Sequence, residues 1–346
     1  MRSNGRFAGW PHVVYSQQFS REWIVEEFFP QAREMKKVFL AGGSNLLQGK
    51  NMVALFYQPS TRTRGSFQMA MTKLGGGVAF ATENAAKFSS AEKGESLDHT
   101  IKVWNCYRPD VIVLRHDKEG AAEIAAKVSS VPIINAGDGP AQHPTQALLD
   151  VFTIQEKLGR IDGISIVISG DLANNRAARS LVYLLSKWNV VIHFISPPVQ
   201  SMKEDVLSHL RERGVSFTEG ERLEEKIPLA DVVYMLRTQR EHGSAIFDYD
   251  SRYNLDAPKA SLAKSSAIFM HPLPIDSRVK EINPEVEKDP RSVFLTDQVE
   301  SGMCTRMALL SMVIAEKQRW LGSRFSYWLA SKKRRNSATS RQKVIA

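Results

Sequence analysis

The sequence predicts an α/β protein with two doubly wound parallel-sheet domains. Strand-like apolar runs alternate with helix-like stretches along most of the chain, a pattern typical of parallel sheets covered by helices. With 346 residues, 43% of them hydrophobic, the chain has the length of about two domains with their own cores. A long helical stretch between the two sets of strands is expected to join them.

Apolar runs bounded by turn residues are predicted as strands at 51–57, 110–115, 131–135, 164–169, 190–195, 231–235 and 266–270. Helical spacing lies between them, as in 64–74, 119–127 and 177–187. The interdomain helix is placed at 143–163, ending near Gly163. The predicted units are domains at 1–150 and 151–302, a C-terminal helix at 303–320 packing back on the first domain, and a basic tail at 321–346 expected to be disordered.

Composition limits the classes of function. Cys106 and Cys304 lie far apart without a CxxC pair, which favours a reducing compartment and argues against a disulfide framework or a cysteine-based zinc site. The eight histidines form no HxxxH or HxH pattern, so no metal is expected. No apolar run is long enough for a membrane span, and the first residues lack the apolar region of a signal peptide. A cytoplasmic protein is expected, or an organellar one from which a transit peptide has been removed.

The net charge of +9 comes almost entirely from one end of the chain. Residues 319–346 hold eight Lys or Arg and no Asp or Glu, and subtracting eight from nine leaves +1 for residues 1–318. A solvated, disordered end is the plainest interpretation of this tail, with a localisation signal or a tether to an anionic surface as the alternative. The tail alone motivates nucleic-acid binding, which is therefore not the leading interpretation.

Polar clusters follow six of the predicted strands. Ligands of parallel sheets bind at the carboxyl ends of the strands, so these clusters are expected where a substrate would lie. In chain order they are "QPSTRTR", Arg115 with His116, "NAGDGPAQHPTQ", "GDLANNR", "LRTQR" and "HPLP". Structural loops are usually rich in Gly, Asp and Ser, whereas these carry Arg, His, Gln, Asn and Pro.

The stretch "QPSTRTRGSF" at 58–67 joins a predicted strand to a predicted helix. A helix N-terminus offers free N–H groups and a partial positive charge, to which this one adds Ser60, Thr61, Arg62 and Thr63. Together they predict a site for a phosphate-like dianion. An ordinary Ser/Thr cap with two exposed arginines is the plainer alternative. Neither GxxxxGK[ST] nor GxGxxG occurs, so a nucleoside triphosphate or a dinucleotide is not indicated.

Three further motifs suggest the rest of a substrate pocket. Lys93, in "AEKGES", is a cation that could swing onto a phosphate, unless the stretch is only a solvated loop. His143 and Gln146 share a helix start, where a histidine can donate a hydrogen bond to a carbonyl oxygen or merely cap the helix. Arg176 and Arg237 each follow a strand of the second half, and two guanidiniums suit a dicarboxylate unless each forms a surface salt bridge.

The two prolines of "HPLP" at 271–274 fix backbone carbonyls, which can accept hydrogen bonds from an amide NH2. The motifs therefore describe three adjoining sites, for a phosphate, for a carbonyl bearing an amide nitrogen, and for an acidic co-substrate. These are the sites needed to move a carbamoyl group from carbamoyl phosphate to an amino acid.

With these motifs in this order, the sequence resembles the aspartate carbamoyltransferases of early pyrimidine biosynthesis, in the aspartate/ornithine carbamoyltransferase family. The resemblance covers about residues 10–316 and rests on "PSTRTR", "KGES", "LRH", "NAGDGPAQHPTQALLD", "GDLANNR", "YMLRTQ", "HPLP" and "RMALL". Ornithine carbamoyltransferases share the phosphate loop but carry HCLP and an SMG motif, neither of which occurs here.

The resemblance implies that the first domain binds carbamoyl phosphate and the second binds aspartate, in a homotrimer with active sites between subunits. The implied phosphate ligands are Ser60, Thr61, Arg62, Thr63 and Arg115. The implied groups around the carbamoyl carbonyl are Thr63, Arg115 and His143, and those around its NH2 are Gln146 and the backbone of Leu273 and Pro274. The implied aspartate ligands are Lys93, Arg176, Arg237 and Gln239.

The same resemblance names a catalytic set, which is Arg62, Thr63, Lys93, Arg115 and His143. Ser89 and Lys93 are implied to enter from the neighbouring subunit. Neither a metal nor an organic cofactor is implied.

The sequence departs from the family's usual pattern at Gln58 and His242, where glutamate and arginine are common. These charges usually pair across the domains in the closed state. Their joint loss predicts closure through neutral hydrogen bonds, with altered or absent cooperativity. Asn175 stands for a glycine and Ile275 for an arginine. Since Asn tolerates positive φ, the turn at Asn175 is expected to survive.

Two alternatives stay open at this point. One is a carbamoyltransferase for a different amino acid. The other is a carbamoyltransferase-like protein that has lost catalysis and serves as a binding or regulatory partner. The presence of Arg62, Lys93, His143, Arg176 and Arg237 argues against the second.

Overall fold

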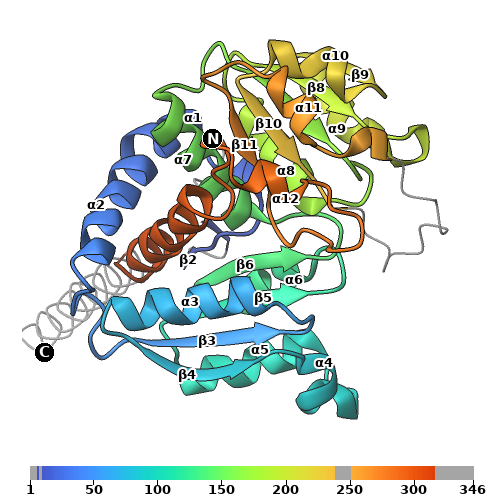
Figure 1. Cartoon of the computed structure of the whole chain (residues 1–346). Coiled ribbons are helices and arrows are strands. Elements are labelled where there is room, and N and C mark those ends of the chain that lie inside the picture. The colour runs from blue at the N-terminus through green and yellow to red at the C-terminus, as the bar shows by residue number, and fades with distance from the viewer. Residues whose placement is uncertain (1–5, 8–9, 238–250, 316–346) are drawn as a thin grey trace, which may run out of the picture.

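A computed structural model describes residues 6–7, 10–237 and 251–315 of the chain (Figure 1). Two parallel sheets with flanking helices confirm the predicted α/β fold. Gln239, His242, residues 316–320 and the basic tail 321–346 lie outside the described residues. The predicted domain limits stay a prediction, although the two sheets fall on either side of the predicted boundary.

The first sheet has the strand order β4-β3-β5-β6. Its strands are β3 (Asn51–Phe56), β4 (Gly77–Thr82), β5 (Val111–His116) and β6 (Ile133–Asp138). Around them lie α3 (Thr61–Lys73), α4 (Ala85–Phe88), the 3-10 turn η3 (Ser90–Lys93), α5 (Leu97–Tyr107) and α6 (Ala121–Val128). The central strand β3 is buried from its second residue on, which is why it reads as a continuous apolar run.

The second sheet has the strand order β11-β10-β7-β8-β9. Its strands are β7 (Ser165–Ser169), β8 (Val191–Ile195), β9 (Ser216–Gly220), β10 (Val232–Met235) and β11 (Ile268–Met270). Its helices are α8 (Arg176–Leu185), α9 (Glu204–Glu212), α10 (Leu223–Lys226), α11 (Ala257–Ser261) and α12 (Pro284–Glu287). The edge strands β4 and β9 were not predicted. Both are partly exposed; β9 has no continuous apolar run, whereas β4 has only the short run "VAFA" at 78–81.

In each sheet the chain order reverses in the middle. β3 has β4 on one side and β5 on the other, and β7 has β8 on one side and β10 on the other. At such a switch point the loops after two neighbouring strands diverge and leave a crevice at their carboxyl ends. The loops after β3, β5, β7 and β10 carry most of the residues predicted to bind substrate.

Helix α7 (Pro144–Leu158) joins the two halves and is shorter than predicted. It ends at Leu158 because Gly159 takes a left-handed conformation, with φ of 71°, so the helix does not run on to Gly163. The closing helix is longer than predicted at its start: it covers 297–315 in the described part of the chain, six residues before the predicted 303. It lies beside α2 (Phe29–Leu40), which continues α1 (Arg21–Trp23) and the π-turn η2 (Ile24–Phe28) (Figure 1). The remaining short strands are β1 (Arg6–Phe7) and β2 (Trp10–Pro11).

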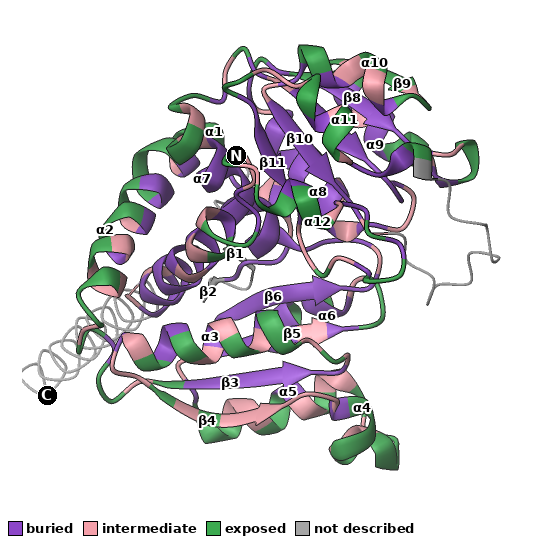
Figure 2. Ribbon diagram, in the orientation of Figure 1, coloured by how far each residue is buried: buried purple, intermediate pink, exposed green. Residues whose placement is uncertain are grey.

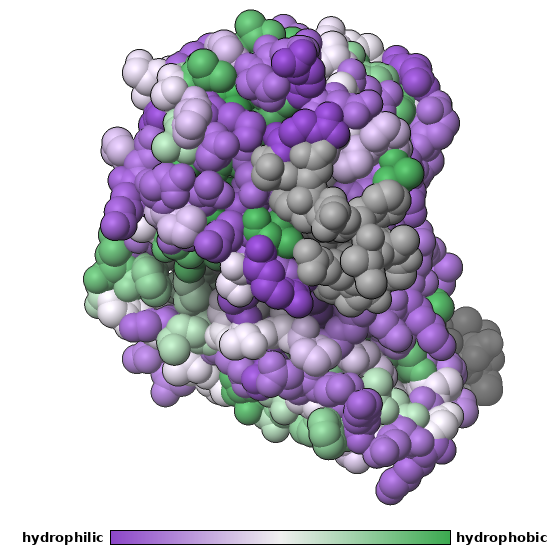
Figure 3. Space-filling view, turned by 45° about the vertical axis from the view of Figure 1, so that its right-hand side comes forward, coloured by the Kyte–Doolittle hydropathy of each residue, from purple (hydrophilic) through white to green (hydrophobic). Residues whose placement is uncertain are grey.

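The largest hydrophobic cluster runs through both halves without a break. It contains residues of β3 and α3, of α7 and the closing helix, and of β7, α8 and β10. In Figure 2, β3, β10 and the closing helix are drawn largely in the purple of buried residues, whereas α3 is purple on only part of its surface. The face shown in Figure 3 is mostly hydrophilic, with its apolar side chains in small scattered groups. Among the described residues, no helix is both long and apolar enough to cross a bilayer.

One buried carboxylate, Asp150 of α7, ties the halves together within this core. Its Oδ2 accepts a hydrogen bond of 2.7 Å from the Tyr234 hydroxyl on β10. Its Oδ1 accepts from Nε2 of Gln298 on the closing helix at 2.7 Å and from Nε2 of Gln146 at 3.0 Å. Asp150, with no exposed surface, thus receives donors from three parts of the chain.

The burial of Asp150 predicts a pH dependence of stability. Burial raises its pKa to about 7, against the opposing hydrogen bonds from Tyr234, Gln298 and Gln146. An unfolded Asp titrates at about 3.9, so between about pH 4 and pH 7 the folded chain keeps a proton that the unfolded chain has lost. This stabilisation is complete below about pH 4 and is lost as the pH rises through about 7.

We therefore expect the Tm of the wild type to fall by several degrees relative to that of Asp150→Asn between about pH 5 and pH 8. The asparagine keeps an oxygen acceptor and does not titrate. The contributions of all other titrating groups to the pH dependence of Tm are therefore the same in both proteins and cancel in the difference. Scanning calorimetry of both proteins across this range measures it. A Tm difference that stays constant with pH would show that Asp150 titrates alike in the folded and unfolded states.

Candidate functional site

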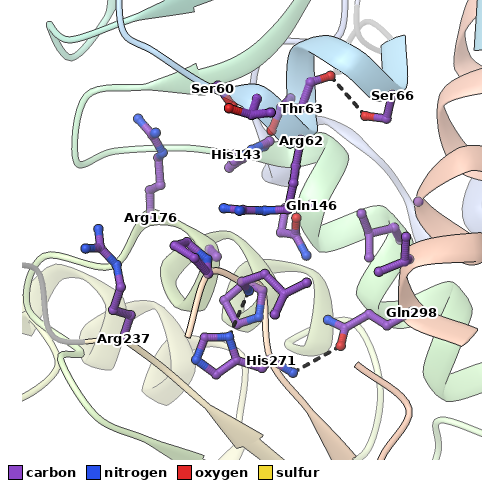
Figure 4. A pocket seen from close by; sticks show the side chains of 18 of the residues that line it. Ser60, Arg62, Thr63, Ser66, His143, Gln146, Arg176, Arg237, His271 and Gln298 are labelled. Atoms are coloured by element: carbon purple, nitrogen blue, oxygen red, sulfur yellow. Dashed lines mark hydrogen bonds between the residues drawn. The ribbon is translucent and has the colours of Figure 1, made fainter. Parts of the chain in front are cut away.

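A cavity of about 620 Å³ lies where the switch points of the two sheets face each other (Figure 4). It is lined by the loop after β3, by Arg115 at the end of β5, by the start of α7 and by Arg176 at the start of α8. Arg237 after β10, the loop 271–274 after β11 and the closing helix complete the wall. Both halves of the chain thus contribute to one site.

The start of α3 forms the wall expected to hold a phosphate. The helix begins at Thr61, and its N-cap Ser60 makes no side-chain capping bond, so the Ser60 hydroxyl is not consumed by the helix. Arg62 and Thr63 line the cavity, whereas Arg64 turns to Glu83, with 3.2 Å between Nη2 and Oε2. Burial, and then the charge of Arg237, lowers the pKa of Arg62.

Two guanidiniums from different halves meet over Gly137 of β6. A Cβ at Gly137 would lie 2.9 Å from Cζ of Arg176 and 3.2 Å from Nη1 of Arg115, so only a glycine leaves room for both. Arg176 donates to the carbonyl of Gly139 at 2.8 Å. Burial, and then the charges of Arg176 and Arg62, lowers the pKa of Arg115 to about 9, and burial lowers the pKa of Arg176 to about 10.

His143 precedes α7 as its N-cap residue and is held from the second half of the chain. Its backbone N–H donates to the Ser180 hydroxyl of α8 at 2.7 Å. Burial, followed by the charges of Arg176 and Arg115, lowers the pKa of His143 well below its ordinary value. The imidazole is therefore neutral at pH 7, so one ring nitrogen carries an N–H that can donate and the other can accept.

The loop 271–274 turns its backbone at Leu273, whose φ of 57° is in the left-handed region that a non-glycine residue seldom adopts. The Leu273 N–H donates to Nδ1 of His271 at 2.8 Å, which holds the turn. Burial, and then the charges of Arg62 and Arg237, lowers the pKa of His271 to about 3. The ring is neutral, with its proton on Nε2.

The structure brings together most of the predicted site residues. Those lining the one cavity are Ser60, Thr61, Arg62, Thr63, Arg115, His143, Gln146, Arg176, Arg237, Leu273 and Pro274. Ser89 and Lys93, at the turn η3 beyond β4, do not line it, and their entry from a neighbouring subunit stays a prediction. Gln239 lies outside the described residues.

Asn175 departs from expectation in its conformation. Its φ is −90°, so the tolerance of asparagine for positive φ is not needed. Its side-chain oxygen instead accepts from the backbone N–H groups of Ala177 and Ala178, at 3.0 Å and 3.3 Å. This caps α8 directly beside Arg176.

Among the lining residues to which sequence reasoning gave no role are the polar side chains of His271, Gln298 and Arg306. Arg306 is buried and its guanidinium lies 5.5 Å from the Phe67 ring centroid. A Cβ at Gly302 would lie 2.6 Å from its Nη1, so a glycine one turn earlier makes room for it. The sequence does contain a signal for Arg306, which is an arginine within the otherwise apolar run "RMALL". An arginine on a buried helix face is rare unless it has a partner or a ligand.

The charge of the cavity is strongly one-sided. Five guanidiniums line it, those of Arg62, Arg115, Arg176, Arg237 and Arg306, and no Asp or Glu of the described residues does so. Neighbouring arginines add to the effect of burial in lowering the pKa of Arg62 and Arg115, so an anionic ligand between these guanidiniums would be bound favourably. No group of three or more His, Cys, Asp or Glu in the described part of the chain is arranged to hold a metal ion.

Comparisons with known proteins agree with this geometry. Sequence models of the aspartate/ornithine carbamoyltransferase family match the chain, the carbamoyl-P binding domain over residues 12–156 and the Asp/Orn binding domain over residues 162–313. Aspartate carbamoyltransferase of Arabidopsis thaliana, named as chloroplastic, is 46% identical over 308 residues, which are 87% of this chain and 77% of the relative.

Two solved structures share the fold. Aspartate transcarbamoylase from Trypanosoma cruzi, in complex with carbamoyl phosphate and aspartate, is 38% identical with a TM-score of 0.80, covering 87% of this chain and 94% of that one. The catalytic subunit of M. jannaschii aspartate transcarbamoylase is 41% identical with a TM-score of 0.80, covering 88% of this chain and 98% of that one. The chain therefore belongs to the aspartate/ornithine carbamoyltransferase family.

Proposed function

We propose that this protein transfers the carbamoyl group of carbamoyl phosphate to the amine of L-aspartate, giving N-carbamoyl-L-aspartate and phosphate for pyrimidine biosynthesis. The observation that carries the proposal is the single cavity in which a helix N-terminus faces five guanidiniums from both halves of the chain. The Trypanosoma cruzi relative has been solved with both of these substrates.

The phosphate of the donor lies at the start of α3 in this proposal. The N–H groups of the first helical turn and the hydroxyls of Ser60, Thr61 and Thr63 bind its oxygens, and the guanidiniums of Arg62 and Arg115 balance its charge. The half-buried Arg115 gains from a dianion, because burial and two neighbouring cations lower its pKa.

The carbamoyl group lies between the start of α7 and the loop 271–274. Thr63, Arg115 and the neutral His143 donate to its carbonyl oxygen. The side-chain oxygen of Gln146 and the backbone carbonyls of Leu273 and Pro274 accept from its NH2. This arrangement distinguishes the oxygen from the nitrogen of the carbamoyl group and orients its carbon.

The two carboxylates of aspartate bind to Arg176 and Arg237, which flank one side of the pocket in Figure 4. Gln239 and Lys93 complete this site in the proposal, with Lys93 and Ser89 supplied by the next subunit of a homotrimer. The two cysteines suit a reducing compartment, and we place the enzyme in the cytoplasm or in an organelle, as for the chloroplastic plant relative.

The reaction then needs no base from the protein. The unprotonated amine of aspartate attacks the carbamoyl carbon, and negative charge builds on the carbonyl oxygen. Thr63, Arg115 and His143 stabilise that oxygen, at a few kcal/mol for each well-placed donor. The C–O bond to phosphate breaks, and the leaving phosphate takes the proton that the amine loses. Holding both substrates in one cavity supplies further acceleration.

The first experiment measures carbamoyl transfer by the purified protein to L-aspartate, with L-ornithine and other amino acids assayed beside it. We expect turnover with aspartate alone. Turnover with another amino acid would keep the phosphate site and overturn the roles of Arg176, Arg237 and Gln239. Binding of carbamoyl phosphate without turnover on any acceptor would indicate a non-catalytic binding or regulatory protein.

Gly137→Ala tests the meeting of Arg115 and Arg176. The added Cβ displaces one or both guanidiniums, and losing a charge-assisted hydrogen bond lowers kcat/KM for carbamoyl phosphate by about 10- to 100-fold. Gly42→Ala is the control, because Gly42 has φ of 96°, against 125° at Gly137, and no atom lies within 4 Å of its added Cβ. Steady-state kinetics and Tm are compared; equal activity losses in both variants would assign the effect to backbone strain.

Co-expression of Lys93→Ala and His143→Ala chains tests the shared site. Each variant alone is expected to be nearly inactive. In a mixed homotrimer, whichever variant supplies two of its chains, one site of the three combines an intact His143 with an intact Lys93 from the next subunit, so about one third of the wild-type activity returns. Mixed trimers are separated by differently charged tags and assayed. No recovery in trimers shown to be mixed would place Lys93 within its own chain's site.

A further inference from the structure

The Gln146 side chain and the loop 271–274, which are both assigned to the carbamoyl NH2, come from separate parts of the chain. Both are connected to the carboxylate of Asp150, the loop through Gln298. Gln146 donates through Nε2 to Oδ1 of Asp150 at 3.0 Å, and Gln298 donates through Nε2 to the same oxygen at 2.7 Å. Gln298 in turn accepts, through Oε1, the backbone N–H of His271 at 3.0 Å. Both glutamines line the cavity, whereas Asp150 lies behind them.

This arrangement fixes which end of each amide faces the substrate. A carboxylate oxygen accepts hydrogen bonds, so only the nitrogen end of a glutamine can face it. Gln146 is therefore left with its side-chain oxygen as the group available to a ligand. The oxygen end of Gln298 is directed onto His271. A reversed Gln146 would present NH2 to the carbamoyl NH2, donor against donor.

The same carboxylate reaches the loop 271–274 through Gln298. The Gln298 bond holds the His271 backbone, and the His271 ring accepts from the Leu273 N–H at 2.8 Å. Leu273 has the unfavourable φ of 57°, so its carbonyl direction depends on these bonds. One buried oxygen thus aligns both acceptors.

The alignment does not depend on the charge of Asp150. Both glutamines share Oδ1, and the Tyr234 hydroxyl is on Oδ2 at 2.7 Å. A proton on Oδ2 would donate to the Tyr234 oxygen, since a hydroxyl can both donate and accept, and Oδ1 would be unchanged. The buried Arg306 supplies the positive charge nearby.

We propose that Asp150 and Gln298 are positioning residues that select for an amide NH2 on the acyl phosphate donor. They make the pocket prefer carbamoyl phosphate over acetyl phosphate, which has a methyl group in place of the NH2. The inference rests on the proposed function and deepens it, because it names what the site recognises in its donor.

The test compares carbamoyl phosphate, acetyl phosphate and inorganic phosphate in the full-length enzyme. KM for carbamoyl phosphate and competitive inhibition constants for the other two are measured. Gln298→Met keeps the length of the side chain and removes both of its hydrogen bonds. We expect it to lower the preference for carbamoyl over acetyl phosphate by about tenfold, the value of one well-formed hydrogen bond, with the inhibition constant of inorganic phosphate unchanged.

Three variants of the network separate positioning from folding. Asp150→Leu removes the shared acceptor and is expected to lose the preference as Gln298→Met does. Asp150→Asn keeps an oxygen for both glutamines, with its NH2 toward Tyr234, and is expected to retain the preference. Tyr234→Phe, the matched control, loses a bond to the same carboxylate, so its Tm falls while its preference is kept. Gln298→Met decides the question if Asp150→Leu does not fold.

The results distinguish a failure of the proposed function from a failure of the inference about Asp150 and Gln298. A wild type without any preference for carbamoyl phosphate overturns the proposed function and the inference with it. A wild-type preference that Gln298→Met retains overturns the inference alone. A parallel loss of affinity for all three ligands, inorganic phosphate included, would show that Gln298 only supports the structure and would also overturn it.

Discussion

Five guanidiniums around one cavity are the constraint on which the rest of this structure depends. Like charges held together out of water repel and lose solvation. The lowered pKa of Arg115 reflects both effects, and that of Arg176 reflects the loss of solvation. Backbone oxygens in and just after β6 hold two of the five. Arg176 donates to Gly139 at 2.8 Å, and Arg115 lies 3.5 Å from the oxygen of Ala136. A rigid carbonyl frame keeps the cations in place without neutralising them.

The interface between the two halves follows from the same constraint. A cavity lined by cations from both halves requires that the halves be held in a fixed relative position. Hydrogen bonds between them contribute to this. Ser180 of α8 accepts from the His143 N–H at 2.7 Å and donates to Gln142 at 3.0 Å. Asp150, which receives Tyr234 from the second sheet, extends these hydrogen bonds into the core. Helix α7 is therefore both a wall of the site and the joint between the halves.

Features of the fold and the site that depend on neighbouring residues in the sequence could be predicted, whereas those that depend on contacts between distant residues could not. Central strands and the polar loops after them were predictable, because burial on both faces and loop chemistry are local signals. The half-exposed edge strand β9 gave no such signal. Gln298 was missed because its partners, Asp150 and His271, are far away in the chain. The end of α7 at Gly159 was missed since Gly159 and Gly163 were equally good stops from sequence alone.

The departures from the family pattern acquire a physical meaning from the charge of the cavity. Ile275 packs against the hydrophobic cluster of the second sheet, so the position usually held by an arginine adds to the core here. Asn175 caps α8 and thereby fixes the helix start that carries Arg176. Gln58 lines the cavity, where a glutamate would set a carboxylate among the guanidiniums and compete with an anionic substrate. A neutral amide at this position leaves the positive charge of the site available to the substrates.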